Sequence, residues 1–205
     1  MKLYSTVAKE ASAEQTIEKS RFITYVRPVS TREEADAFIA EIKKKHKDAT
    51  HNVPAMVIGE GFQIQWASDD GEPQGTSGAP IVQMLVQEEI TNVAVVVTRY
   101  FGGIKLGTGG LVRAYTSSAK LGLEAAGIRE VKEIKVVTYR LDYGIFNKVQ
   151  NFTFEQDVSI ENIEYTDVVK FDLLTEPELS DAVKCTITGL ANGREKIIDE
   201  KIEKF

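Results

Sequence analysis

The segment 98–115 combines glycines, basic side chains and aromatic rings in a pattern that could hold an anion. Five glycines fall within 102–110, after a β-branched run typical of a buried strand and before a stretch typical of a helix. Glycines let backbone N–H groups approach a ligand, and a helix N-terminus favours negative charge. The same glycines would equally suit a tight turn that packs a helix against a sheet. The candidate residues for binding nucleic acid or another anion are Arg99, Tyr100, Gly102, Gly103, Lys105, Gly107, Thr108, Gly109, Gly110 and Arg113.

The glycine spacing does not match the common nucleotide-binding motifs. A Walker A loop needs a lysine after its last glycine, whereas Thr108 follows Gly107. A dinucleotide-binding fingerprint that starts at Gly107 needs a glycine at position 112, which is Val112. The spacing therefore argues against both nucleotide hydrolysis by a P-loop and dinucleotide binding.

Asp69, Asp70 and Glu72 form an acidic turn whose oxygen atoms could bind magnesium. An ordinary solvated turn explains these acids more simply, because an Asp-Gly pair is itself a turn signal. The two histidines, His46 and His51, have no paired cysteines, so we expect no zinc site. We predict no metal and no cofactor, and we keep the acidic turn as the alternative site.

A serine at position 77 stands in a Gly-Thr-Ser-Gly segment that superficially resembles the nucleophile segment of trypsin-like proteases. His51 and Asp69 or Asp70 precede Ser77 in the matching chain order. Catalytic triads are defined by geometry rather than by order, and the helix signals nearby contradict a double β-barrel. We therefore interpret Ser77 as part of a turn that leads into a helix, and assign no catalytic residue.

The elements that must position these residues alternate between strands and helices. The first helix, 31–47, is marked by Ser30 and Glu33 in capping-box spacing and by lysines at its far end. Period-two and buried runs predict strands, and apolar spacing with helix start and stop signals predicts further helices. We expect strands at 21–29, 52–58, 62–66 and 92–98, and helices at 80–89 and 111–126.

The C-terminal part has a different and more regular order. We expect a strand at 134–141, a helix at 143–155, strands at 158–165 and 167–174, a helix at 176–188 and a strand at 196–203. This βαββαβ order is that of the ferredoxin-like fold. The boundary near 129–132 gives two predicted domains, 1–130 and 131–205, and an α+β class.

Charge and cysteine content limit the classes of function. Residues 1–129 carry 15 acidic and 15 basic side chains, whereas 130–205 carry 16 and 10, so the whole excess of negative charge is C-terminal. A nucleic-acid site must therefore be a local basic patch in the N-terminal part.

The single cysteine, Cys185, is predicted to be a small buried residue of a cytosolic protein. No stretch is long and apolar enough to span a membrane, so we expect a cytoplasmic protein.

Two long segments resemble the signature blocks of the YigZ/IMPACT family. They are SDDGEPQGTSGAP at 68–80 and VVVTRYFGGIKLGTGGLVRAY at 95–115, and the early Ser-Arg-Phe-Ile at 20–23 also fits. The resemblance implies an N-terminal α/β sandwich shared by ribosomal and GHMP-kinase-like domains. It also implies a ferredoxin-like C-terminal domain similar to the last domain of elongation factor G. Eukaryotic IMPACT proteins restrain a starvation-activated kinase that controls translation initiation, which implies a role linked to translation.

The leading hypothesis is a non-catalytic, translation-associated regulatory or binding protein. It would contact RNA, the ribosome or a translation factor through the loop 99–113, with Tyr100, Phe101 and Tyr115 as stacking surfaces. The rival hypothesis is an enzyme or small-ligand protein in which the 102–110 loop holds a nucleotide phosphate or other anion, assisted by magnesium at the acidic turn. A purely protein-binding adaptor is the third alternative, since the sequence does not separate it from an RNA-binding protein.

Overall fold

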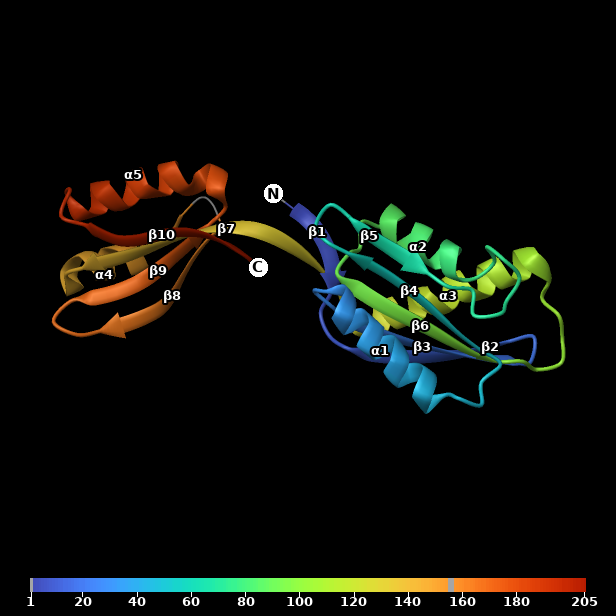
Figure 1. Ribbon diagram of the computed structural model, residues 1–205. Coiled ribbons are helices and arrows are strands. Elements are labelled where there is room, and N and C mark those ends of the chain that lie inside the picture. Colours follow the sequence, from blue (N-terminus) through green and yellow to red (C-terminus); the bar gives the residue numbers. More distant parts are fainter. Residues whose placement is uncertain (1, 155–156) are drawn as a thin grey trace. The chain divides into compact units, whose positions relative to one another are not determined.

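A computed structural model of the protein describes residues 2–154 and 157–205. The chain divides into two compact units, Tyr4–Glu130 and Val131–Phe205, and Lys2 and Leu3 belong with the second. We call these the N-terminal unit and the C-terminal unit. Each has its own sheet and hydrophobic core (Figure 1). The predicted α+β class is confirmed.

The N-terminal unit is built on an antiparallel sheet in the order β2-β3-β6-β4-β5. Helix α1 covers one face of this sheet, and helices α2 and α3 cover the other (Figure 1). The strands are β2 (Ala11–Ile17), β3 (Ser20–Pro28), β4 (His51–Ile58), β5 (Ile64–Ala67) and β6 (Val93–Tyr100). The helices are α1 (Arg32–Lys45), α2 (Gly78–Gln87) and α3 (Gly107–Ala126).

Strand β6 lies at the centre of this sheet and contributes to the cores on both faces. Val95 and Val97 belong to the core under α2 and α3, whereas Ala94 and Val96 belong to the core under α1. This alternation follows from the two-residue period of a strand. The side chain of Arg99 therefore falls on the α2/α3 face.

The C-terminal unit has the ferredoxin-like arrangement that the sequence predicted. Its sheet has the order β1-β7-β9-β8, and β10 also pairs with β7. Buried residues of β7 and β9 form one core with those of α4 and α5. The elements that lie wholly in this unit are α4 (Tyr143–Gln150), β8 (Val158–Tyr165), β9 (Val169–Thr175), the 3-10 turn η1 (Pro177–Leu179), α5 (Ser180–Ala191) and β10 (Lys196–Lys204). Strands β1 (Lys2–Val7) and β7 (Ile128–Leu141) each have residues in both units.

Several predicted helix bounds differ from those observed. Helix α1 is capped by Thr31 Oγ1, which accepts from Glu34 N at 3.2 Å, so the predicted cap Ser30 was wrong by one residue. Helix α3 begins at Gly107, so the last four residues of the predicted 102–110 loop are its first turn. Helix α4 ends at Gln150, well before the predicted bound of 155, which itself lies outside the described residues.

Three features were not predicted correctly from the sequence. Strands β1 and β2 were not expected, because both are short and mix polar with apolar residues. Cys185 was predicted to be buried, but its side chain is exposed on α5. It lies two positions from each of the core residues Val183 and Ile187, and therefore on the solvent side of the helix. Throughout residues 2–154 and 157–205, no helix is both long and apolar enough to cross a membrane.

Candidate functional site

A buried ion pair between Arg99 and Glu72 lies at the C-terminal end of β6. Nη1 of Arg99 donates to Oε1 of Glu72 at 2.6 Å, and their side chains are 5% and 4% exposed. Nη2 of Arg99 donates to Ser20 Oγ at 3.2 Å. The guanidinium carbon lies 5.4 Å from the ring centroids of both Phe22 and Phe101. Two hydrogen bonds and two aromatic rings therefore hold the charged group of Arg99 in one orientation.

Tyr115, on α3, completes the surroundings of this carboxylate. Its hydroxyl donates to the same Glu72 Oε1 at 2.7 Å. Burial, together with this bond to an anion, raises the pKa of Tyr115 far above its usual range. The phenol therefore remains a hydrogen-bond donor at every physiological pH. Its ring packs edge-on against Phe22, with the centroids 5.4 Å apart.

His51 adds a third polar group beside Glu72. Its backbone pairs with that of Arg99 across strands β4 and β6. Ring atom Nδ1 lies 2.8 Å from the carbonyl oxygen of Asp70, which can only accept, so Nδ1 carries the proton. The other ring nitrogen, Nε2, lies 3.7 Å from Glu72 Oε1, beyond hydrogen-bond distance.

These side chains border a pocket of about 450 Å³ in the N-terminal unit. Its size is that of a small-molecule site. Its lining combines residues of the loop 101–106 and the first turn of α3 with the buried polar groups just described. The lining residues are Thr50, His51, Glu72, Pro73, Arg99, Phe101, Lys105, Leu106, Gly107, Thr108 and Leu111.

The N-terminus of α3 opens toward this pocket without a side-chain cap. Its N-cap residue, Leu106, makes no capping hydrogen bond, while Gly107 and Thr108 line the pocket. The first N–H groups of a helix have no intrahelical partner and carry partial positive charge. Lys105, exposed beside them, adds a full positive charge. This wall of the pocket is therefore suited to an anion.

The loop 101–106 is fixed at its start by neighbouring segments. The N–H of Phe101 donates to Thr50 Oγ1 at 3.0 Å, and that of Gly102 donates to Ser20 Oγ at 3.2 Å. A Cβ at Gly102 would lie 1.9 Å from the carbonyl oxygen of Lys19, so only glycine fits there. The hydrogen bonds and this close approach hold the first half of the loop in place before any ligand arrives.

The structure separates the predicted binding residues rather than gathering them. Arg99 is buried in its ion pair, and Lys105 lines the pocket with Gly107 and Thr108. Lys105 also lines a second cavity of about 430 Å³, where Arg113 lies. Gly109 and Gly110 are part of the first turn of α3, and Gly103 lies in the loop with a φ of 89°.

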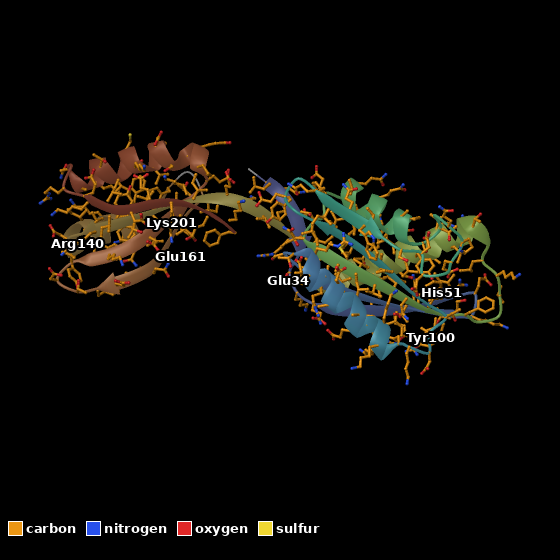
Figure 2. All side chains as sticks on the ribbon, viewed as in Figure 1. Glu34, His51, Tyr100, Arg140, Glu161 and Lys201 are labelled. Atoms are coloured by element: carbon orange, nitrogen blue, oxygen red, sulfur yellow. The ribbon has the colours of Figure 1, made fainter. Side chains whose placement is uncertain are left out.

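Tyr100 points to the opposite face of the sheet. Its hydroxyl lies 2.8 Å from Nδ1 of His46, whose Nε2 lies 2.7 Å from the hydroxyl of Tyr25. Burial, with the charges of Lys45 and Arg21 nearby, lowers the pKa of His46. Figure 2 shows His51 and Tyr100 at the same end of the N-terminal unit. The pairing of Arg99 and Tyr100 in one site was wrong, since successive strand residues face opposite sides.

The three acids of the predicted acidic turn do not converge. Asp69 accepts bonds at the start of α2, from the N–H groups of Ser77 and Gly78 and from the Ser77 hydroxyl. Partial burial alone would raise the pKa of Asp69, but these hydrogen bonds lower it below its ordinary value. The Ser77 hydroxyl is thereby engaged in the turn that leads into α2.

Asp70 serves a different purpose from its neighbours. Its Oδ2 accepts from the N–H of Asn52, and its Oδ1 from Lys43, each at 2.7 Å. Glu72 is committed to Arg99 and Tyr115. In the parts of the chain that the structure describes, no group of three His, Cys, Asp or Glu side chains could hold a metal ion. The structure thus gives Asp69, Asp70 and Glu72 separate protein partners rather than one shared cluster of oxygen atoms.

Sequence reasoning did not find the association of Glu72, Arg99, Tyr115 and His51. Glu72 and Arg99 are 27 positions apart, and Glu72 and Tyr115 are 43 apart, so no local pattern connects them. One usable signal was the alternation along β4 and β6, which places His51 and Arg99 on the face of the buried valines. The facing residues of an antiparallel pair would then bring the two side chains together.

Comparison with protein families covers both units. Residues 18–123 match the Impact N-terminal domain, and residues 140–194 match a domain of unknown function, DUF1949. The first match includes every residue of the ion-pair network and the whole pocket wall. The second lies within the ferredoxin-like unit.

Individual relatives agree with these matches. The chain is 43% identical to the IMPACT family member YvyE of Bacillus subtilis, over 95% of this chain and 89% of that protein. It is 35% identical to the IMPACT family member YigZ of Escherichia coli, over 74% of this chain and 75% of that protein. It is also 35% identical to mouse Protein IMPACT, over 45% of this chain and 30% of that protein. A crystal structure of a hypothetical protein aligns with a TM-score of 0.60 at 29% identity, covering 98% of this chain and 100% of that one. The chain therefore belongs to the YigZ/IMPACT family.

Proposed function

We propose that the protein is a non-catalytic, translation-associated binding protein that contacts single-stranded RNA through the surface around Lys105. The observation that carries this proposal is the position of Lys105. It borders both the 450 Å³ pocket and the cavity with Arg113, beside the uncapped N-terminus of α3. A strand of RNA laid over Lys105 would meet the N-terminus of α3 in the pocket and Arg113 in the second cavity.

The charges that remain available are few and local. Glu72 neutralises Arg99, whereas Lys105 and Arg113 form no ion pair with the residues that the structure describes. Both are exposed, so they can approach phosphate groups without breaking an existing interaction. Residues 1–129 have no net charge, so such a patch supports salt-sensitive contact with a few phosphates rather than extensive wrapping.

Exposed apolar side chains stand next to these charges. Phe101 is 46% exposed and Ile104 is 37% exposed, both within the loop 101–106. Proteins that bind single-stranded nucleic acid without strict sequence preference combine a positive groove with aromatic rings on which bases stack. Phe101 offers such a ring, because it rests against the fixed guanidinium of Arg99 on one side.

The link to translation comes from the family. Part of this chain matches mouse Protein IMPACT. The resemblance to the IMPACT family implies a role in the regulation of translation. RNA, the ribosome or a translation factor would be the partner, with the ferredoxin-like unit supplying a second contact surface. An adaptor that binds only proteins would lack the salt-dependent RNA binding tested next.

The test is the binding of a 5′-fluorescent oligouridylate across a salt series, measured by anisotropy. Wild type should bind with an affinity that falls steeply with salt. Replacing Lys105 and Arg113 by alanine should reduce the slope by about 0.7 for each phosphate that is no longer neutralised. The matched control is Lys44→Ala, on the exposed side of α1 behind the sheet. The proposal fails if wild type does not bind at low salt, or if the double variant binds like the control.

A small phosphorylated ligand is the second candidate, favoured by the size and the apolar residues of the pocket. Leu106, Leu111, Pro73 and Phe101 could surround a base while the α3 N-terminus holds a phosphate. A nucleoside monophosphate would then raise the melting temperature, because a ligand that binds only the native state stabilises it. Stabilisation by the mononucleotide without any binding of oligouridylate would favour this candidate.

A further inference from the structure

The first turn of α3 lines the pocket and carries no negative charge of its own. Its N-cap residue, Leu106, makes no capping hydrogen bond, and residues 107–110 include no Asp or Glu. The first N–H groups of the helix, those of Gly107 and Thr108 included, have no intrahelical partner and carry the positive end of the helix dipole. A helix start alone does not define a site, so the other groups that line the pocket decide what it can hold.

A second, independent donor belongs to Arg99, whose side chain also lines the pocket. Its Nη1 and Nη2 donate to Glu72 and Ser20, but its buried Nε has no hydrogen-bond partner among the described residues. The whole side chain is only 5% exposed. A buried donor without a partner is costly, and a bound ion or water is one of the ordinary reasons why a folded protein keeps such an atom. The Nε atom therefore points to a ligand that accepts hydrogen bonds.

The charged side chains of the pocket leave an excess of positive charge. Glu72 is the only acid among the described residues that line it, and its carboxylate already accepts from Arg99 and Tyr115. Lys105 is exposed and forms no ion pair within the described parts of the chain. Because two cations stand against one carboxylate, the lining attracts an anion rather than a cation.

The pocket has the size of a site for one small group rather than for a length of strand. Its volume of about 450 Å³ lies within the range of small-molecule sites. Lys105 and Leu106 also line the second cavity of about 430 Å³, where Arg113 lies. A strand whose terminal nucleotide occupies the pocket would therefore continue past Lys105 to a second cation.

We infer that this pocket takes the 5′-phosphorylated end of an RNA strand, and that the start of α3, Lys105 and the unpartnered Nε of Arg99 bind its terminal phosphate. The inference rests on the proposed RNA binding and narrows it to one end of the strand. A phosphate monoester carries about −1.5 to −2 charge at neutral pH and three free acceptor oxygens. A phosphodiester within the strand carries a single negative charge. A pocket with spare donors and spare positive charge therefore selects the terminal group.

The test compares three oligouridylates of one length, each with a fluorophore on a central base so that both ends are free. One has a 5′-phosphate, the second has the same phosphate at its 3′ end, and the third has neither. Wild-type protein should bind the first at least about tenfold more tightly than the others, because hydrogen bonds to a charged group are strong. Equal binding of the two phosphorylated strands would overturn the inference and leave RNA binding intact. If no strand binds, the RNA proposal fails as well, and a higher melting temperature with uridine 5′-monophosphate would assign the phosphate site to a free nucleotide.

Two variants of Thr108 show whether the pocket is responsible. Thr108 is exposed in the first turn of α3 and lines the pocket. Thr108→Glu adds a carboxylate where it stabilises a helix start, so the protein should fold while the phosphate is repelled and the preference for the 5′-phosphate is lost. Thr108→Gln has nearly the same shape without the charge and should keep the preference. Circular dichroism melts establish that both variants are folded. A folded Thr108→Glu protein that retains the full preference, or an equal loss in both variants, would contradict the assignment.

Discussion

Arg99 and Glu72 form a charge pair that is almost completely removed from solvent, at the point where the central strand β6 ends. The pair joins the sheet to the turn 68–77, and through Tyr115 it also joins both to α3. Burying two charges costs several kcal/mol of hydration for each, which the mutual attraction and added hydrogen bonds must offset. The pair therefore stabilises the pocket only while both partners are present.

Removal of one partner should be much more harmful than removal of both. Glu72→Met leaves the Arg99 guanidinium buried without its anion, and we expect a loss of about 3–5 kcal/mol in the free energy of unfolding. The double variant Glu72→Met with Arg99→Met should recover most of that loss. Hydrogen exchange of amides within Tyr4–Glu130 measures this for the N-terminal unit alone. A single variant that costs less than about 1 kcal/mol would show that the pair is not buried in solution.

Two buried tyrosines offer a matched comparison of hydroxyl groups. Tyr115→Phe removes a donor to the Glu72 carboxylate and should cost about 1.5–3 kcal/mol. Tyr139→Phe, in the C-terminal core, removes a hydroxyl that has no hydrogen-bond partner among the described residues, so it should be neutral or stabilising. Hydrogen exchange in each unit reports both effects separately. Equal costs for the two changes would contradict the hydrogen-bond assignment.

Asp69 should make the stability of the N-terminal unit depend on pH. The hydrogen bonds from the start of α2 hold the pKa of Asp69 below its ordinary value of 3.8. A lowered pKa in the folded state means that the carboxylate stabilises the protein above that ordinary value, and that the contribution is lost as the pH falls through the folded pKa.

Asp69→Asn should therefore be less stable than wild type by about 1 kcal/mol at neutral pH, as for other helix caps that are removed. The difference should shrink as the pH falls below 3.8. Urea denaturation of wild type and variant at a series of pH values measures the stability difference at neutral pH and its decrease at low pH. A difference that stays constant down to the lowest pH would mean that the charge of Asp69 contributes nothing.

Two glycines of the predicted loop should respond to alanine in opposite ways. At Gly102 a Cβ would lie 1.9 Å from the carbonyl oxygen of Lys19, so Gly102→Ala must displace backbone, and we expect a cost of about 1–3 kcal/mol. At Gly109, inside α3, the nearest atom would be Arg113 Nη1 at 3.7 Å, an ordinary van der Waals distance. Gly109→Ala should stabilise the protein by about 0.5–1 kcal/mol through helix propensity. Thermal melts give the change in melting temperature for each variant. Changes of the same sign and similar size would contradict the loop geometry.

Most of the fold could be predicted because its signals are local. The β-branched run of β6, the apolar spacing and the C-terminal lysines of α1, and the regular order of the C-terminal unit are each read within a few positions of sequence. The start of α3 was placed too late, because glycines such as Gly109 are poor helix formers and hide the first turn. In this turn the surrounding structure outweighs the low helix propensity of glycine.

The candidate site could be predicted only in part. Lys105 and Gly107 were singled out from the pattern of glycines and basic residues, and both line the pocket. The commitment of Arg99 to Glu72 depends on an ion pair between distant segments, which no spacing reveals. Tyr100 could have been excluded, since neighbouring residues of a strand point to opposite faces.

The most direct test of the central claim is to map where RNA touches the protein. A short oligouridylate bound to the intact protein is cross-linked by ultraviolet light, and the modified peptides are identified by mass spectrometry. RNA contact through the Lys105 surface predicts adducts on the peptide that contains Phe101, and their disappearance in a variant with both Lys105→Ala and Arg113→Ala. Adducts confined to Val131–Phe205, or bound RNA that never labels the loop 101–106, would contradict it.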